Sequence, residues 1–279
     1  ADAACYAAKQ RGRNQVCIYD GEDMTQGQRH DETDLLAQIT QALEQDRFEF
    51  YYEPVVRSEH KSSDEPFYLE LTLRMQMDDG APPMVAAEFL PAAERYFLMT
   101  AIDRWVVHQA LQRLAEFDSE SIRIGINLSG QSLGDATFTA YVLEQIEHAQ
   151  INPAQLLFEI TESAAVSYIA EAVHFIKSLK KLGCRFALDD FGTGMSSFAY
   201  LRDLPVDLLK VDKRFVQASP DSPVDRALIQ AQVNIARELG IETIAEGVET
   251  KAQSETLHKL GVSYQQGFLL ADPQPLKTL

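Results

Sequence analysis

Basic residues, cysteine and tryptophan are scarce in this sequence of 279 residues. Lys and Arg total 25 against 42 Asp and Glu, which gives a formal net charge of −17. Because phosphate backbones are bound by basic surfaces, this balance argues against a nucleic-acid polymer as a partner. A small anionic ligand is still compatible with the charge if metal ions or a few cations offset the repulsion. The three cysteines, Cys5, Cys17 and Cys184, are widely spaced and form no metal-ligand or redox motif, which is typical of a reducing compartment.

Hydrophobic runs long enough for a membrane span are also missing from the sequence. The longest apolar stretches are far shorter than the roughly 20 residues that a span requires, and no charged and then apolar leader opens the chain. We therefore expect a cytoplasmic domain. Because the chain starts at Ala1, within a helical pattern, we also expect a fragment of a longer protein, in which membrane or sensory segments could come first.

The beginning of the chain divides into three parts. Residues 1–20 predict a short Ala-rich helix and a strand, which is too little to fold alone. The polar residues 21–33 predict a linker. An amphipathic helix near residues 34–45 then opens a domain that we expect to extend over residues 34–279.

From Phe48 onward, short apolar segments alternate with helical patterns. Eight segments are typical of strands: FEFYYEPVV, FYLELTLRM, IRIGINLS, LLFEITES, CRFALDD, DLLKVD, ETIAEGVE and SYQQGFLL. Helices are predicted between them, among others over residues 101–116, 139–149, 170–182 and 224–239. Such alternation predicts an α/β fold with a mostly parallel sheet, and the number of strands favours a closed, TIM-like (β/α) barrel over an open sheet.

Polar residues stand in or at the end of several of these apolar strands. They are Glu70, Asn127, Glu159, the pair Asp189 and Asp190, Lys210, and Glu246. Barrels of this type collect their chemistry at the C-terminal ends of the strands, and acidic groups inside strands are destabilising unless something pairs with them. Any one of these carboxylates could simply cap a helix or meet an arginine. Their recurrence on five strands favours a shared cation.

The types of these residues indicate which cation. Oxygen ligands without His or Cys indicate Mg²⁺, Mn²⁺ or Ca²⁺ in preference to Zn²⁺. The adjacent carboxylates Asp189 and Asp190 suggest more than one ion, because Asp189 could bridge two metals while Asp190 reaches one. Two ions side by side are the usual arrangement for the hydrolysis of a phosphate ester. None of the six histidines forms a cluster, and we assign none to catalysis.

Six segments, in order, resemble the motifs of the EAL domain family. They are INLS (126–129), FEITES (158–163), DDFGTGMSSFAYL (189–201), LKVD (209–212), AEGVET (245–250) and QQGF (265–268). The resemblance covers about residues 34–279. It implies a barrel phosphodiesterase that uses two divalent cations, Mg²⁺ or Mn²⁺, to open cyclic di-GMP to linear pGpG, and that Ca²⁺ inhibits.

The same resemblance implies roles for individual residues. It assigns one metal to Glu70, Asn127, Glu159 and Asp189, and the second to Asp189, Asp190 and Glu246. It makes Lys210 and Glu246 the catalytic pair, with Lys210 beside the attacking water. Glu162 would anchor the DDFGTG loop, which the family also uses for dimer contacts, so we expect a homodimer. Arg74 would bind phosphate, and Asp212 and Gln266 would lie near the ligand.

Two positions depart from the family pattern. The signature tripeptide is Glu70-Leu71-Thr72 instead of Glu-Ala-Leu, so a hydroxyl-bearing residue lies under the expected ligand. Glu53, in YYEP, stands where the family commonly has a Gln that reads a guanine edge. A carboxylate lacks the amide donor and adds negative charge near an anionic ligand, although it could still accept hydrogen bonds from guanine. We therefore expect weaker ligand binding.

Two further interpretations follow from the resemblance. Some EAL domains have lost catalysis and only bind cyclic di-GMP, so a receptor is the alternative to the enzyme, and Glu53 and Thr72 are its support in the sequence. Residues 1–20 resemble the C-terminal tail of a GGDEF (diguanylate cyclase) domain. The parent is then expected to be a tandem GGDEF-EAL protein with a sensor domain upstream, in which the barrel could also regulate the GGDEF domain.

Overall fold

The computed structural model describes residues 26–59, 66–77, 80–117, 121–194 and 198–278. The predicted helix and strand of residues 1–20, and residues 21–25 of the predicted linker, lie outside these ranges. The chain divides into two compact units. The described part of the smaller unit is residues 26–48, 75–77 and 80–98, and the larger unit contains residues 49–74 and everything from residue 99 onward.

The smaller unit consists of two packed helices, α2 (Gln26–Glu44) and α3 (Ala86–Arg95), and the short strand β3 (Met84–Val85). Ile39 of α2 is fully buried, and the rings of Phe48 and Phe89 lie 5.6 Å apart. The helix predicted near residues 34–45 begins earlier, because residues 26–33 are also helical. Polar residues continue the helix there because no proline interrupts the segment.

In the larger unit, eight of the described strands close a barrel in the order β1-β9-β8-β7-β6-β5-β4-β2, with β2 pairing back to β1. The strands are β1 (Phe48–Arg57), β2 (Tyr68–Met75), β4 (Ile124–Leu128), β5 (Leu156–Thr161), β6 (Arg185–Phe191), β7 (Leu208–Val211), β8 (Glu242–Ala245) and β9 (Tyr264–Gln265). The strands from β2 round to β9 pair in parallel, whereas β1 runs antiparallel to β9 and to the short β10 (Gln274–Pro275). The predicted barrel is confirmed, with one reversed strand.

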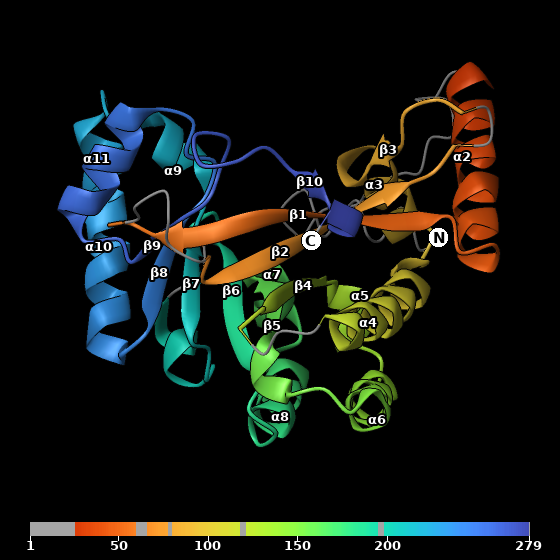
Figure 1. The fold of residues 1–279 in the computed structure, drawn as a ribbon. Helices are drawn as coiled ribbons and strands as arrows, with labels where there is room; N and C mark the ends of the chain where they lie inside the picture. Colours follow the sequence, from red (N-terminus) through yellow and green to blue (C-terminus); the bar gives the residue numbers. More distant parts are fainter. Residues whose placement is uncertain (1–25, 60–65, 78–79, 118–120, 195–197, 279) are drawn as a thin grey trace, which may run out of the picture. The chain divides into compact units, whose positions relative to one another are not determined.

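Helices connect the parallel strands along their outer side (Figure 1). The longer ones are α4 (Met99–Glu116), α6 (Phe138–Ala149), α8 (Ile169–Lys180), α10 (Pro223–Leu239) and α11 (Lys251–Leu260). Four of them correspond to predicted helices to within about two residues at each end. Short helices or turns complete the connections: α5 (Gly130–Leu133), α7 (Glu162–Ser167), α9 (Lys213–Ala218), η1 (Pro153–Gln155), η2 (Phe198–Arg202) and, at the end of the chain, η3 (Leu276–Thr278).

Aromatic packing and helix caps stabilise this arrangement locally. Phe158 of β5, Phe175 of α8 and Phe186 of β6 are buried, with ring centroids between 5.6 and 5.9 Å apart. Helix α11 begins with a capping box between Thr250 and Gln253, which satisfies backbone N–H groups at the helix start. Across the described ranges, no helix combines the length and the apolar character that a bilayer crossing demands.

Candidate functional site

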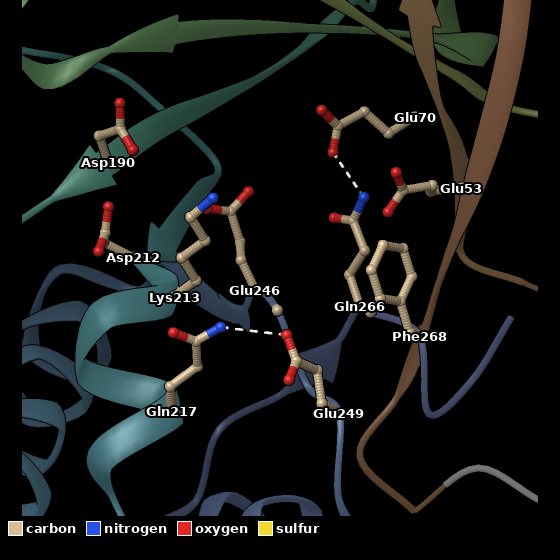
Figure 2. A pocket seen from close by; sticks show the side chains of 12 residues that line it. Glu53, Glu70, Asp190, Asp212, Lys213, Gln217, Glu246, Glu249, Gln266 and Phe268 are labelled. Atoms are coloured by element: carbon tan, nitrogen blue, oxygen red, sulfur yellow. Dashed lines mark hydrogen bonds between the residues drawn. The ribbon is translucent and has the colours of Figure 1, made fainter. Parts of the chain in front are cut away.

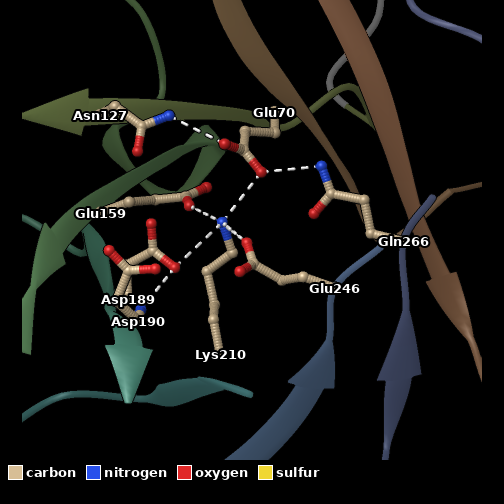
Figure 3. A network of polar contacts seen from close by, with 8 residues as sticks. All are labelled: Glu70, Asn127, Glu159, Asp189, Asp190, Lys210, Glu246 and Gln266. Carbon is tan, nitrogen blue, oxygen red and sulfur yellow. Dashed lines mark hydrogen bonds and ion pairs between the residues drawn. The ribbon is translucent and has the colours of Figure 1, made fainter. Parts of the chain in front are cut away.

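The C-terminal ends of the parallel strands bring together the polar residues that the sequence singles out (Figure 3). The strand register explains their convergence, because Asn127 pairs with Glu159 across β4 and β5, and Thr161 pairs with Asp189 across β5 and β6. The full group is Glu70, Asn127, Glu159, Asp189, Asp190, Lys210, Glu246 and Gln266.

Lys210 occupies the centre of the group and is fully buried. Its Nζ lies 2.9 Å from an oxygen of Glu70, 2.5 Å from Glu159, 2.7 Å from Glu246 and 3.7 Å from Asp189. Burial alone would lower the pKa of Lys210, but these four carboxylates outweigh it and raise that pKa well above the ordinary value. Lys210 is therefore a permanent buried cation.

Glu70 is held by three donors. Lys210 donates to Oε2 at 2.9 Å, Gln266 Nε2 donates to the same oxygen at 2.8 Å, and Asn127 Nδ2 donates to Oε1 at 2.8 Å. Burial acts to raise the pKa of Glu70, but Lys210 and the hydrogen bonds outweigh it, so the pKa is lowered. Glu70 is thus ionised at neutral pH, and its orientation is fixed.

The remaining carboxylates hold more negative charge than Lys210 can neutralise. Burial, with Glu70 next in effect, raises the pKa of Glu159 to about 8, and burial holds the pKa of Glu246 well above its ordinary range. Glu159 Oε1 is buried and has no hydrogen-bond partner among the described residues. A buried oxygen without a hydrogen-bond partner, beside carboxyl groups whose pKa values are raised, is compatible with the binding of a further cation.

Asp189, Asp190 and Glu246 form a second set of oxygen donors. One oxygen from each of the three lies within 4.8 Å of the others. Asp190 has a left-handed φ of 54°, next to a register shift in β6, and its backbone N–H donates to Asp189 Oδ1 at 2.8 Å. Burial, then the charges of Asp189 and Asp212, raises the pKa of Asp190 to about 6. This geometry is compatible with a divalent cation.

The group opens into a pocket of about 350 Å³ (Figure 2). Its acidic lining residues are Glu53, Glu70, Asp190, Asp212, Glu246 and Glu249, and its basic one is Lys213. An anionic ligand would be repelled from such a wall unless metal ions offset the charge. Phe268 also lines the pocket and is 59% exposed, so it offers an aromatic face to a ligand.

Residues expected to touch the ligand fall into two groups. Glu53, Asp212 and Gln266 line the pocket, and Gln266 donates to Glu70. Burial, with the charge of Glu70, raises the pKa of Glu53. Arg74 and Thr72 are not among the described lining residues. The Arg74 guanidinium lies 5.2 Å from the centroid of the Tyr51 ring.

Glu162 connects the start of α7 to the DDFGTG segment. It is buried, and its Oε2 accepts a hydrogen bond of 2.8 Å from the backbone N–H of Gly192. Burial, with the nearby charge of Glu162, raises the pKa of Tyr200. Gly192 has a φ of +86°, a conformation that favours glycine. The segment after Asp190 is thus tied to the start of α7.

Besides the two glycines Gly247 and Gly267, sequence reasoning missed four residues of the pocket lining: Lys213, Gln217, Glu249 and Phe268. Three of them lay beside residues that were singled out, since Lys213 follows Asp212, Phe268 ends the QQGF motif and Glu249 belongs to AEGVET. Gln217 had no signal of its own. It is one helical turn beyond Lys213 on α9 and donates to Glu249 at 3.1 Å.

The fold and the cluster together define an α/β barrel with an acidic, lysine-centred site at its strand ends. The model of the EAL domain family matches residues 36–273 of the chain. The chain belongs to the EAL domain family.

Individual relatives and structures agree with this assignment. The chain is 38% identical to the cyclic di-GMP phosphodiesterase PdeB of Shewanella oneidensis, over 99% of the chain and 32% of PdeB. It is 32% identical to MucR of Pseudomonas aeruginosa, a bifunctional diguanylate cyclase/cyclic di-GMP phosphodiesterase, over 100% of the chain and 40% of MucR. The solved PaMucR phosphodiesterase in complex with c-di-GMP has a TM-score of 0.80 at 31% identity, covering 88% of the chain and 99% of that structure. The chain therefore spans less than half the length of these curated relatives.

Proposed function

We propose that this chain hydrolyses cyclic di-GMP to linear pGpG in a reaction that depends on divalent metal ions. The observation that carries the proposal is the fully buried Lys210 among four carboxylates, two of which, Glu70 and Glu246, line the pocket. A buried charge cluster of this kind is costly for folding, which a function in binding or catalysis would explain. The relatives PdeB and MucR, both named as cyclic di-GMP phosphodiesterases, support the same reaction.

Two cation sites are part of the proposal. Glu70, Asn127, Glu159 and Asp189 would hold one ion, and Asp189, Asp190 and Glu246 would hold the other. The unpartnered Glu159 Oε1 and the three oxygens within 4.8 Å support these sets. Because the donors are all oxygens, Mg²⁺ or Mn²⁺ is proposed, with Ca²⁺ as an inhibitor. Bound ions would lower the pKa of a water molecule and offset the charge of the phosphodiester.

The protein's own residues would orient the reactants and stabilise charge. Lys210 donates to Glu70 and Glu159, and so fixes the carboxylates on two strands. Its ammonium group would also stabilise the negative charge that develops on the phosphoryl oxygens and the attacking water. With Glu246, which it contacts at 2.7 Å, Lys210 forms the proposed catalytic pair. Glu162 would keep Asp190 in position through its bond to Gly192.

The pocket wall would recognise the nucleotide. Gln266 Oε1 is buried without a hydrogen-bond partner among the described residues, so it would accept from the N1–H or amino group of guanine. Glu53, beside it, would compete for the same donors. Phe268 would offer a stacking face, Arg74 would bind a phosphate oxygen, and Asp212 and Thr72 would lie near the ligand.

The setting of the domain in a longer protein is also proposed. The parent chain would contain a sensor domain, then a GGDEF domain and then the EAL domain. Two copies would form a homodimer through their EAL domains. The bifunctional name of MucR supports the tandem arrangement. The finding that no described helix suits a bilayer crossing is compatible with a cytoplasmic domain, including one anchored through other segments of the parent.

Hydrolysis and mere binding can be separated in one experiment. The purified chain is incubated with cyclic di-GMP and Mn²⁺, and pGpG is followed by chromatography. Steady product formation is expected, with its loss in Glu70→Ala and Lys210→Ala. Lys259→Ala, which removes an exposed lysine of α11, is the matched control and should keep full activity. Tight binding without turnover in both Mg²⁺ and Mn²⁺ would contradict the enzyme and favour the receptor, which the carboxylate of Glu53 in the pocket supports.

A further inference from the structure

We propose that Asp103 is a positioning residue for Asn127, and that it acts by fixing the chain directly after β4. The inference rests on the proposed metal site, to which Asn127 belongs. Asp103 lies in α4 and is only 3% exposed, which is rare for an aspartate unless it has partners. Among the described residues it accepts hydrogen bonds from Ser129 and Ser132, which are not proposed ligands, so its effect would pass through the backbone.

All of these hydrogen bonds converge on one oxygen. Asp103 Oδ2 accepts from the backbone N–H of Ser129 at 2.9 Å, from Ser129 Oγ at 2.6 Å and from Ser132 Oγ at 2.6 Å. Ser129 is also the N-cap of α5, where its Oγ accepts from the backbone N–H of Ser132. One buried carboxylate of α4 therefore locks both the last residue of the INLS motif and the first turn of α5.

Asn127, two residues before Ser129, depends on this lock more than its neighbours do. The other residues of β4 are buried, whereas the side chain of Asn127 is exposed, so packing does not fix it. Its Nδ2 donates to Glu70 Oε1 at 2.8 Å, and Figure 3 shows its carbonyl oxygen turned away from Glu70. The direction of that oxygen is set by the backbone, which the β-sheet holds on one side and Asp103 holds on the other.

The neighbouring Arg104 provides a control within the same connection. Its Nη2 lies 3.1 Å from Asp135 Oδ2 and 2.7 Å from Thr137 Oγ1, and its backbone carbonyl accepts from the hydroxyl of Tyr141. Arg104 thus ties the far end of the β4 to α6 connection to the same helix. Loss of Arg104 would loosen this connection without touching Ser129.

The test measures Mn²⁺ binding by calorimetry, independently of catalysis. Asp103→Ala is expected to lower Mn²⁺ affinity by on the order of tenfold, as is usual when a residue behind a metal ligand is lost. The loss should fall on the same site that Asn127→Ala weakens. Asp103→Asn retains an acceptor oxygen and should restore affinity to within about threefold of the wild type. Arg104→Ala should lower the melting temperature while leaving Mn²⁺ affinity unchanged.

A double-mutant cycle separates positioning from general destabilisation. In the Asn127→Ala background, Asp103→Ala should cause no further loss of affinity, because the ligand that it positions is gone. Additive losses, or wild-type affinity in a folded Asp103→Ala chain, would overturn the inference. If Asp103→Ala does not fold, Ser129→Ala replaces it in the cycle. We expect Ser129→Ala to cause a smaller loss of Mn²⁺ affinity, and additive losses with Asn127→Ala would again overturn the inference. Unchanged Mn²⁺ binding in Asn127→Ala would instead contradict the proposed metal site that contains Asn127.

Discussion

Lys210 and Glu159 form an ion pair in which both side chains are fully buried, with Nζ 2.5 Å from Oε2. Even so, the pKa of Glu159 is raised to about 8, because burial, together with the charge of Glu70, outweighs the attraction of Lys210. Lys210 also contacts Glu70 and Glu246. The single positive charge of Lys210 does not neutralise all of these carboxylates. Protonation of Glu159 near neutral pH removes part of the excess negative charge.

Metal binding is therefore expected to release protons. At pH 7, below a pKa of about 8, Glu159 is mostly protonated in the metal-free chain, and a carboxylate must lose its proton to bind a cation. Mn²⁺ affinity should rise from pH 6 to pH 9, and the number of protons released at each pH should fall above pH 8. Calorimetry in buffers of different ionisation enthalpy measures this number. Glu159→Gln should abolish the proton release that comes from Glu159. An Mn²⁺ affinity that is independent of pH would contradict this prediction.

Stability of the metal-free chain should fall as the pH rises through the same range. The pKa of Glu159 is raised from an ordinary 4.5 to about 8, and that of Asp190 from 3.8 to about 6, so the folded state binds more protons than the unfolded state between these values. The stabilisation is complete below about pH 4 and is lost by about pH 8. Thermal unfolding in EDTA at pH 5.5 and pH 8.5 should show the lower melting temperature at pH 8.5. Glu159→Gln should reduce the difference, and a higher melting temperature at pH 8.5 would be the contrary result.

Glu53→Gln should strengthen the binding of cyclic di-GMP. The substitution removes one negative charge from a pocket with six acidic lining residues and adds an amide donor beside Gln266. An increase in affinity of on the order of tenfold, about 1.4 kcal/mol, is expected. Calorimetry in Ca²⁺, which should permit binding while slowing hydrolysis, gives the dissociation constant.

Glu249→Gln is the matched control for this change. Glu249 is another acidic residue of the pocket wall, and it is engaged by Gln217 at 3.1 Å. If charge alone matters, both substitutions should raise affinity equally. If recognition of the base matters, Glu53→Gln should have the larger effect. Unchanged affinity in Glu53→Gln would show that this carboxylate does not hinder the ligand.

Gly192→Ala should disturb the metal site as well as the fold. A Cβ added at Gly192 would lie 2.6 Å from Nε2 of Gln232, and its φ of +86° is strained for any L-residue. We expect a loss of stability of roughly 1–3 kcal/mol. Mn²⁺ affinity should also fall, because the N–H of Gly192 holds Glu162 close to Asp190.

Gly240→Ala is the control for backbone strain. Gly240 ends α10 with a φ of +69°, but an added Cβ would meet nothing within 4 Å. Its replacement should cost roughly 1–2 kcal/mol of stability and leave Mn²⁺ affinity unchanged. Equal effects of the two glycine substitutions on Mn²⁺ binding would contradict a special role of the DDFGTG segment.

The barrel could be predicted from the sequence because its signal is local. Alternating apolar strands and amphipathic helices repeat from β1 to β9, and the carboxyl ends of parallel strands must meet, which brings residues as distant as Glu70 and Glu246 into one group. The reversed direction of β1 and the early start of α2 could not be predicted. The first depends on pairing with β9 at the other end of the chain, and the second on a polar segment with no helix breaker.

The full burial of Lys210 could not be predicted from the sequence either. A strand-end lysine usually reaches solvent, but Lys210 is fully buried because carboxylates from four other strand ends surround it. Asp103 lies in a helix from which the sequence singled out no site residue, and its link to Ser129 exists only once α4 packs beside β4. Contacts between elements distant in the chain carry no periodicity, so sequence patterns do not contain them.

The dependence of hydrolysis on the metal can be measured by removing the ion and then returning it. The chain is stripped with EDTA, exchanged into metal-free buffer and given cyclic di-GMP, and pGpG is then followed before and after addition of Mn²⁺. The account predicts no product without metal, immediate and steady pGpG formation on addition of Mn²⁺, and a rate at least about 100-fold lower in Lys210→Ala under the same conditions. Product formation in EDTA, or none with Mn²⁺ while cyclic di-GMP stays bound, would contradict it.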